Sequence, residues 1–154
     1  PYVDKMIHFY LGEQAILKNV PTYQCREAQD LDYVLSNLEQ LVVKEAQGSG
    51  GYGMLIGPQA SKSQIESFRD KIIATPNLYI AQPTLDLSVC PTLTDFGVAE
   101  RHIDLRPFVL SSPYRTEIVP GGLTRVAMQA GSLVVNSSQG GGVKDTWVVD
   151  NLHS

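Results

Sequence analysis

The chain has 154 residues, of which 43% are hydrophobic and 18% are charged, and its formal net charge is −4. This balance excludes a disordered chain and predicts one globular unit with room for two lobes. Asp and Glu (16) outnumber Lys and Arg (12), so we expect no nucleic-acid partner. We find neither an apolar stretch of about 18 residues nor a signal-peptide pattern, and we expect a cytoplasmic protein with no membrane partner.

The first half of the chain alternates helical and extended patterns. Apolar residues at helical spacing predict helices over residues 2–11, 30–38 and 61–75, the last capped by Ser61 and ended by Pro76. Runs of β-prone residues predict strands over residues 22–25, 41–46, 54–56 and 78–82. Pro83 closes this part of the chain.

The second half consists of short β-prone runs. They predict strands over residues 85–90, 102–110, 114–119, 123–129, 132–136 and 146–149. Helices and strands followed by an antiparallel meander predict the α+β class. We expect two contiguous lobes, over about residues 22–83 and 84–150.

The two cysteines, Cys25 and Cys90, have apolar, strand-like neighbours and no Cys-x-x-Cys spacing. We interpret them as buried, reduced thiols rather than as a disulfide or a metal site. The chain begins at Pro1, within a helical pattern and without an initiator Met. We therefore expect it to be part of a longer protein.

The richest chemical feature is LVVKEAQGSGGYGMLIG at residues 41–57. The four glycines between its two apolar runs, Gly48, Gly50, Gly51 and Gly53, exceed what a tight hairpin needs. They predict a flap whose backbone N–H groups can approach an anion. Lys44 lies on the entering strand, where its ammonium can neutralise phosphate charge. The pattern fits neither a P-loop nor a dinucleotide-binding fingerprint. A surface loop with a solvated lysine is the alternative interpretation.

A second feature is the run RHIDLRPFVL, in which alternation places His102, Asp104 and Arg106 on one face of a strand. A structural Asp104–Arg106 salt bridge is the commoner explanation for such a pair. Arg125, in GGLTRVAM, adds a second guanidinium on a neighbouring β segment. Two arginines and a lysine near a glycine flap suit a triphosphate and a transferring phosphoryl group.

A third feature is the segment 134–145, in which Asn136 precedes a run of Ser and Gly residues. The Asn136 side chain can bind a hard cation through its oxygen or donate to a phosphate oxygen. Lys144 and Asp145 follow, and both are of the kinds that contact a charged substrate. A plain Gly/Ser loop is the alternative interpretation.

Taken in order, these motifs resemble the ATP-grasp enzymes, such as glutathione synthetase and the ligases that add glutamate to proteins. The segments VVKEAQGSGGYGMLIGPQAS, YIAQPT, RHIDLRPFVL, VPGGLTRVA and NSSQGGGVKDTWV are most similar to the circularly permuted ATP-grasp family. The resemblance implies an ATP-grasp-like fold: two lobes of mixed or antiparallel sheet, flanking helices and a flap hairpin. Residues 1–154 would form part of that domain.

The resemblance also implies roles for individual residues. Those implied to hold ATP come from the lysine strand, the flap, the hinge and the arginine lobe: Lys44, Gly48, Ser49, Gly50, Gly51, Tyr52, Gly53, Ala81, Gln82, Leu85, Asp104 and Asn136. In the hinge, Ala81, Gln82 and Leu85 would hold adenine through backbone groups and apolar contact. Arg106 and Arg125 would stabilise the γ-phosphate and an acyl phosphate. Asn136 would be a candidate Mg²⁺ ligand, and the permuted order implies that the other ligands lie outside this chain.

The implied reaction is activation of a carboxylate by ATP, followed by attack of an amine or a thiol. The sequence names neither substrate and gives no oligomeric state. Because metal ligands are implied elsewhere, we expect this chain alone to bind nucleotide weakly and to be catalytically incomplete. The alternative is a non-catalytic nucleotide-binding or interaction module, which would share Lys44 and the flap.

Overall fold

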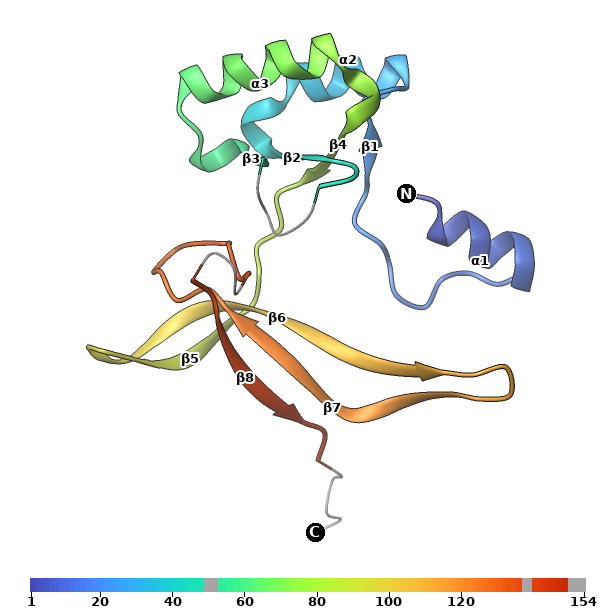
Figure 1. The fold of residues 1–154 in the computed structure, drawn as a ribbon, viewed down its shortest axis with the longest axis vertical. Coiled ribbons are helices and arrows are strands. Elements are labelled where there is room, and N and C mark those ends of the chain that lie inside the picture. The colour runs from blue at the N-terminus through green and yellow to red at the C-terminus, as the bar shows by residue number, and fades with distance from the viewer. Residues whose placement is uncertain (49–52, 137–139, 150–154) are drawn as a thin grey trace. The chain divides into compact units, whose positions relative to one another are not determined.

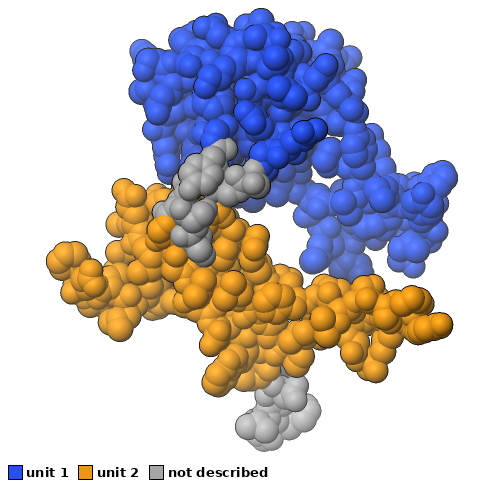
Figure 2. All heavy atoms as spheres, viewed as in Figure 1, with its two compact units in different colours: residues 1–85 blue, residues 86–154 orange. Residues whose placement is uncertain are grey.

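The computed structural model describes residues 1–48, 53–136 and 140–149. Four flap residues, Ser49, Gly50, Gly51 and Tyr52, lie outside the described residues, so the shape of the flap stays a prediction. The chain divides into two compact units, residues 1–85 and 86–154, which Figure 2 colours separately. The predicted division into a lobe with Lys44 and the flap, over about residues 22–83, and a lobe with the two arginines and Asn136, over about residues 84–150, also stays a prediction.

The described part of the first unit combines three α-helices with an antiparallel sheet (Figure 1). The helices are α1 (Val3–Leu11), α2 (Ala28–Ser36) and α3 (Lys62–Ala74), with 3₁₀ turns η1 (Leu38–Gln40), η2 (Gly57–Gln59) and η3 (Pro76–Leu78). The strands are β1 (Tyr23–Gln24), β2 (Leu41–Glu45), β3 (Leu55–Ile56) and β4 (Tyr79–Pro83). Their order in the sheet is β1-β4-β2-β3.

The core of this unit forms where one face of the sheet meets α2 and α3. Leu41 and Val43 alternate along β2 with half-buried residues, and Val43 pairs directly with Ala81 of β4. These side chains pack with Val34 of α2 and Ile72 of α3, and all five are at most 2% exposed. Burying one such aliphatic side chain contributes about 1.5–3 kcal/mol. The sheet is therefore fixed against the two helices by this face.

A capping box fixes the start of α3. Ser61 Oγ accepts a hydrogen bond from Gln64 N at 3.3 Å, and Gln64 Oε1 accepts one from Ser61 N at 2.8 Å. Two backbone N–H groups that lack helical partners are satisfied in this way. The predicted cap at Ser61 is confirmed.

We expect Ser61→Ala to lower the free energy of unfolding by about 1 kcal/mol, because it removes the acceptor for Gln64 N. Urea-induced unfolding followed by circular dichroism measures this change. Ser67→Ala, at an exposed position within the same helix, is the control and should be neutral or slightly stabilising because Ala is the better helix former. Equal losses in both variants would contradict a capping role.

The second unit contains an antiparallel sheet in its described residues (Figure 1). Its strands are β5 (Val89–Thr94), β6 (Gly97–Ser111), β7 (Thr116–Val126) and β8 (Gly142–Trp147), in the order β5-β6-β7-β8. The ladder between β6 and β7 shifts register between Pro107 and Val109. Helices and antiparallel sheets together confirm the predicted α+β class.

Several predicted strand boundaries in this unit are wrong. The predicted strands 114–119 and 123–129 form one strand, β7, because Gly121 and Gly122 lie within a ladder rather than a turn. A Cβ at Gly121 would lie 2.8 Å from Thr146 O, and one at Gly122 would lie 2.8 Å from Arg106 O. Glycine is needed here because neighbouring strands approach closely.

Other predicted strands of this unit differ as well. The strand predicted over 102–110 begins five residues earlier, at Gly97. The strand predicted over 85–90 is displaced to Val89–Thr94, and the last strand begins four residues earlier than predicted, at Gly142. The run 132–136 forms no strand: Val135 is buried, yet the Val134 N–H bonds locally to Ser132 Oγ at 3.1 Å. An apolar run can thus be buried without ladder pairing.

Candidate functional site

Lys44 lies on the face of the first sheet opposite α2 and α3. Along β2 it alternates with Leu41 and Val43, whose side chains are buried against the helices. In the register between β2 and β4, Val42 pairs with Gln82. Because side chains alternate along a strand, Gln82 and Lys44 share this opposite face.

Three side-chain hydrogen bonds connect Lys44 to the segment that precedes β1. Lys44 Nζ donates to Gln82 Oε1 at 2.8 Å, and Gln82 Nε2 donates to Thr22 Oγ1 at 2.7 Å. Thr22 Oγ1 in turn donates to Val20 O at 3.0 Å. In the part of the chain that the structure describes, no salt bridge joins Lys44 to a carboxylate. Its positive charge is therefore held by a neutral amide.

The other predicted hinge residues lie differently. Ala81 points into the core with no exposed surface, and it pairs with Tyr23 on one side and Val43 on the other. Leu85 is half exposed. The predicted contacts of both with adenine stay predictions.

The two described flap residues lie at the ends of the glycine cluster. Gly48 N donates to Glu45 O at 3.1 Å, which closes a turn after β2. Gly53 has a φ of 67°, in the left-handed region that a residue with a side chain rarely adopts. The backbone at this position therefore requires glycine.

A second group of predicted residues meets on one face of the second sheet. Asp104 of β6 and Arg125 of β7 lie directly opposite each other. Arg125 Nε donates to Asp104 Oδ1 at 2.7 Å, Nη2 donates to Asp104 Oδ2, and Nη1 donates to Asn136 Oδ1. The hydrogen bonds to Asp104 raise the pKa of Arg125 above its ordinary value, against the opposing effect of partial burial. The three residues form one part-buried network, which we call the Asp104–Arg125–Asn136 network.

The alternative of a salt bridge between Asp104 and Arg106 is wrong, because Arg125 occupies both oxygens of the carboxylate. Arg106 is exposed and lies opposite Leu123 in the ladder. Its guanidinium forms no salt bridge with any other residue that the structure describes. The two arginines therefore differ: Arg125 is held by two partners, whereas Arg106 is exposed.

Lys144 and Asp145 lie on opposite faces of this sheet. Lys144 pairs with Thr124, one residue before Arg125, whereas Asp145 pairs with Leu123. Because faces alternate, Asp145 shares the face of Arg125 and Lys144 does not. Lys144 Nζ instead donates to Pro91 O and lies 3.5 Å from Cys90 Sγ.

The model of a family described as circularly permuted ATP-grasp type 2 matches residues 1–127. The chain belongs to this family. The resemblance seen in the sequence is confirmed, and the two antiparallel sheets with their helices agree with an ATP-grasp-like fold.

Curated relatives are similar over almost the whole chain. The chain is 55% identical over 148 residues to an uncharacterized protein of Synechocystis, covering 96% of this chain and 31% of that protein. It is 47% identical over 148 residues to an uncharacterized protein of Mycobacterium tuberculosis, covering 96% and 27%. A Frankia alni protein, provisionally named glutamate–cysteine ligase 2-3, is 47% identical over 147 residues, covering 96% and 17%. The chain thus spans about a third or less of the length of these relatives.

Candidate metal ligands are sparse in this ATP-grasp chain. Across residues 1–48, 53–136 and 140–149, no three His, Cys, Asp or Glu side chains are grouped so that they could hold a metal ion. Asn136 Oδ1, the candidate ligand from the sequence, accepts a hydrogen bond from Arg125. Nor does any described helix have the length and apolar character needed to cross a membrane.

Both cysteines of this ATP-grasp chain are free thiols. Cys25 is buried, and burial, with a smaller effect of Asp30, raises its pKa to about 11. Cys90 is partly exposed, so the prediction that both thiols are buried is wrong for Cys90. Its strand lies at the edge of the sheet, where side chains have fewer neighbours.

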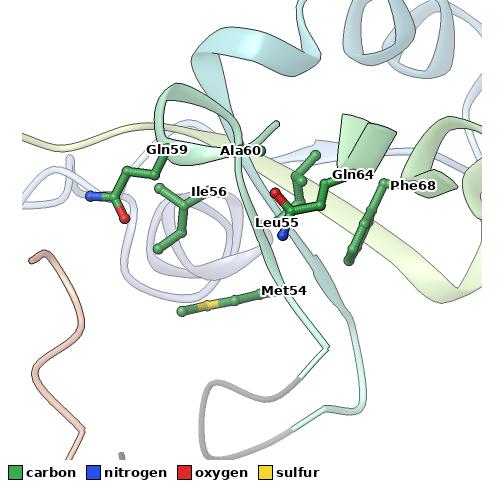
Figure 3. A pocket seen from close by; sticks show the side chains of 7 residues that line it. All are labelled: Met54, Leu55, Ile56, Gln59, Ala60, Gln64 and Phe68. Carbon is green, nitrogen blue, oxygen red and sulfur yellow. The ribbon is translucent and has the colours of Figure 1, made fainter. Parts of the chain in front are cut away.

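A small hollow lies beside β3 and the start of α3 (Figure 3). Its volume is about 200 Å³, and its lining residues are Met54, Leu55, Ile56, Gln59, Ala60, Gln64 and Phe68. Sites for small molecules generally occupy about 300–1,000 Å³. None of the residues predicted to hold ATP lines this hollow, and we assign it no ligand.

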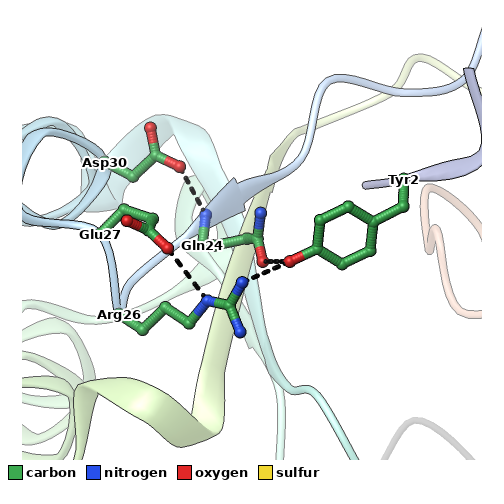
Figure 4. Close-up of polar contacts among 5 residues, drawn as sticks. All are labelled: Tyr2, Gln24, Arg26, Glu27 and Asp30. Atoms are coloured by element: carbon green, nitrogen blue, oxygen red, sulfur yellow. Dashed lines mark hydrogen bonds and ion pairs between the residues drawn. The ribbon is translucent and has the colours of Figure 1, made fainter. Parts of the chain in front are cut away.

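Sequence reasoning missed a set of polar contacts around β1 (Figure 4). The Tyr2 hydroxyl donates to Gln24 Oε1 at 2.6 Å and accepts from Arg26, which also forms an ion pair with Glu27. Gln24 N donates to Asp30 Oδ2 at 2.8 Å, at the start of α2. These contacts tie Tyr2 to β1. Nothing in the sequence pattern signals a pair 22 residues apart.

Proposed function

We propose that this chain is the ATP-binding portion of an ATP-grasp ligase that activates a carboxylate as an acyl phosphate for attack by an amine or a thiol. The observation that carries the proposal is the Lys44 ammonium, which a neutral amide holds on the face of the sheet opposite the helices. A lysine with an uncompensated charge suits an anionic ligand. Membership of the ATP-grasp family supports a triphosphate as that ligand.

The proposed reaction has two steps. A carboxylate oxygen of the substrate attacks the γ-phosphorus of ATP, and the bond to the β–γ bridging oxygen breaks to release ADP. The lone pair of the amine or thiol then attacks the acyl carbon, and inorganic phosphate leaves as the nucleophile loses its proton. Both steps build negative charge on phosphate oxygens, which fixed cations stabilise.

We assign a role in this reaction to individual residues of the chain from their contacts. Lys44 neutralises charge on the ATP phosphates. Arg106, exposed on its strand, offers a planar fork of donors to the transferring phosphoryl group. Arg125 keeps the Asn136 amide in place through the Asp104–Arg125–Asn136 network, so that the amide nitrogen of Asn136 can donate to a phosphate oxygen.

The described residues suit phosphate better than magnesium. Mg²⁺ usually takes one or two carboxylates in addition to phosphate oxygens and waters, and Asp104 is already engaged by Arg125. We therefore assign no step to a metal held by these residues alone. We propose that Mg²⁺ ligands come from the longer protein, as the size of the relatives allows.

Phosphate release tests the proposal. We expect the full-length protein to release phosphate from ATP and Mg²⁺ in the presence of a suitable acid and amine or thiol. We expect the 154-residue chain to bind ATP weakly without turnover. Turnover by this chain alone would show that it holds complete metal ligands, and nucleotide binding without turnover by the full-length protein would favour a non-catalytic module.

A further expected result concerns Arg106. Arg106→Lys in the full-length protein should lower kcat about tenfold while changing ATP affinity little, because an ammonium keeps the charge but loses the bidentate fork. Steady-state kinetics and ATP titrations on the same variant measure the two effects. Equal losses in both would indicate a simple binding role.

A further inference from the structure

We propose that Thr22 and Gln82 are positioning residues that hold the Lys44 ammonium ready for phosphate without neutralising it. This inference rests on the proposed ATP site. It extends that site to Thr22, and it gives the Gln82 side chain a role distinct from contact with adenine. We call the connected side chains of Thr22, Gln82 and Lys44 the lysine relay.

The direction of each hydrogen bond in the lysine relay is forced by chemistry. An ammonium has only donors, so Gln82 must present its oxygen to Lys44. The amide nitrogen of Gln82 then needs an acceptor, which is Thr22 Oγ1. The hydroxyl proton of Thr22 goes to Val20 O. The Gln82 amide can therefore adopt only one orientation while both contacts are kept.

The backbone holds the relay from three places in the sequence. Lys44 lies on β2, Gln82 lies on β4, and Thr22 directly precedes β1, which pairs with β4. All three residues are half-buried. A free lysine side chain loses up to about 2 kcal/mol of rotamer entropy when a ligand orders it. Because the relay orders Lys44 beforehand, less of this loss falls on phosphate binding.

The neutral amide at position 82 distinguishes a role in anion binding from a purely structural role. Among the described residues, Gln82 accepts from one of the three ammonium donors and no carboxylate pairs with the charge, so the positive charge stays available to an anion. A carboxylate in the same place would hold Lys44 as well but would compensate its charge. This arrangement therefore serves an anionic ligand better than it serves fold stability, since a salt bridge would tie β2 to β4 at least equally well.

A purely structural role makes a different prediction. If the relay only ties the strands together, its loss should lower stability and leave the preference for ATP over adenosine unchanged. If it positions Lys44 for phosphate, its loss should weaken ATP binding and leave adenosine binding unaltered. The two ligands differ only in their phosphates, so their affinity ratio separates the two roles.

The test measures ATP and adenosine affinities of the 154-residue chain by calorimetry, with a thermal melt of each variant. We expect Thr22→Val to weaken ATP binding about fivefold and Gln82→Glu about tenfold, with adenosine affinity unchanged. Thr22→Ser keeps the hydroxyl that Thr22→Val removes, and its ATP affinity should equal that of the wild-type chain. Gln82→Glu should keep thermal stability. Thr75→Val is the matched control, because Thr75 Oγ1 also donates to a backbone carbonyl, that of Lys71, at the end of α3.

The outcomes are distinguishable. Unchanged ATP affinity in both Thr22→Val and Gln82→Glu, with ATP bound by the wild-type chain, would overturn the relay and leave the proposed function standing. Equal losses for ATP and adenosine would overturn it too, since Gln82 would then act on the nucleoside. A wild-type chain that binds no ATP would overturn the proposed site itself. Should Thr22→Val unfold, Gln82→Glu and Thr22→Ser decide.

Discussion

Lys44→Ala is expected to weaken ATP binding about ten- to a hundredfold and to leave the stability of the first unit almost unchanged. A hydrogen bond to a charged group contributes about 1.5–3 kcal/mol, and the Lys44 ammonium is the group that the lysine relay holds in place. Its side chain lies opposite the buried face of β2, so its removal leaves the core intact. Calorimetric titration with ATP and Mg²⁺, together with a thermal melt, measures both quantities.

Lys62→Ala is the matched control for this experiment. Lys62 is an exposed lysine of the same unit at the start of α3, and its removal changes the net charge by the same amount. Its loss should leave ATP affinity unchanged. Equal weakening by both variants would indicate non-specific attraction of the nucleotide, and unchanged affinity in Lys44→Ala would remove Lys44 from the site.

The second large effect is expected for stability: Asp104→Ala should lower the free energy of unfolding of the second unit by about 3 kcal/mol. Removing one member of a buried ion pair leaves the other charge without compensation, which costs about 3–5 kcal/mol. The Asp104 and Arg125 side chains are 28% and 18% exposed, which places the effect at the lower end. Urea titration with amide hydrogen exchange measured over β6 and β7 detects the loss in this unit.

Two controls separate the ion pair from the general effect of losing a charge. Glu117→Ala removes the exposed partner of Arg115 and should cost less than about 1 kcal/mol. Adding Arg125→Met to Asp104→Ala removes the unpaired guanidinium and should recover part of the lost stability. If Asp104→Ala is no more costly than Glu117→Ala, Asp104 does not compensate Arg125 in the folded protein.

Local pattern was enough to predict the elements that carry the first half of the site. Helical spacing predicted α1 and α3, and Ser61 predicted the cap of α3, because these interactions involve residues three or four positions apart. Two apolar runs around a glycine cluster predicted β2 and β3. Alternation along β2 is likewise local, and it places Lys44 opposite the buried residues of that strand. The family could also be identified from such contiguous motifs.

What the sequence alone could not determine depends on strand register. Asp104 lies two residues from Arg106 but pairs with Arg125, which is 21 residues away, because β6 and β7 bring these two positions opposite each other. The Gly121–Gly122 pair has the composition of a turn, and only the closeness of β6 and β8 reveals why glycine is needed within a strand.

The lysine relay shows the same difference between what local sequence patterns predict and what strand pairing determines. The sequence by itself determined that this is an ATP-grasp chain with a lysine on a strand entering a glycine-rich segment, because those signals lie within short stretches of residues. Only the tertiary structure decided that Gln82 and Thr22, which are 60 residues apart, meet beside Lys44. Pairing between distant strands depends on how the whole sheet assembles around its core, and no local preference of Thr22 or Gln82 specifies that partner.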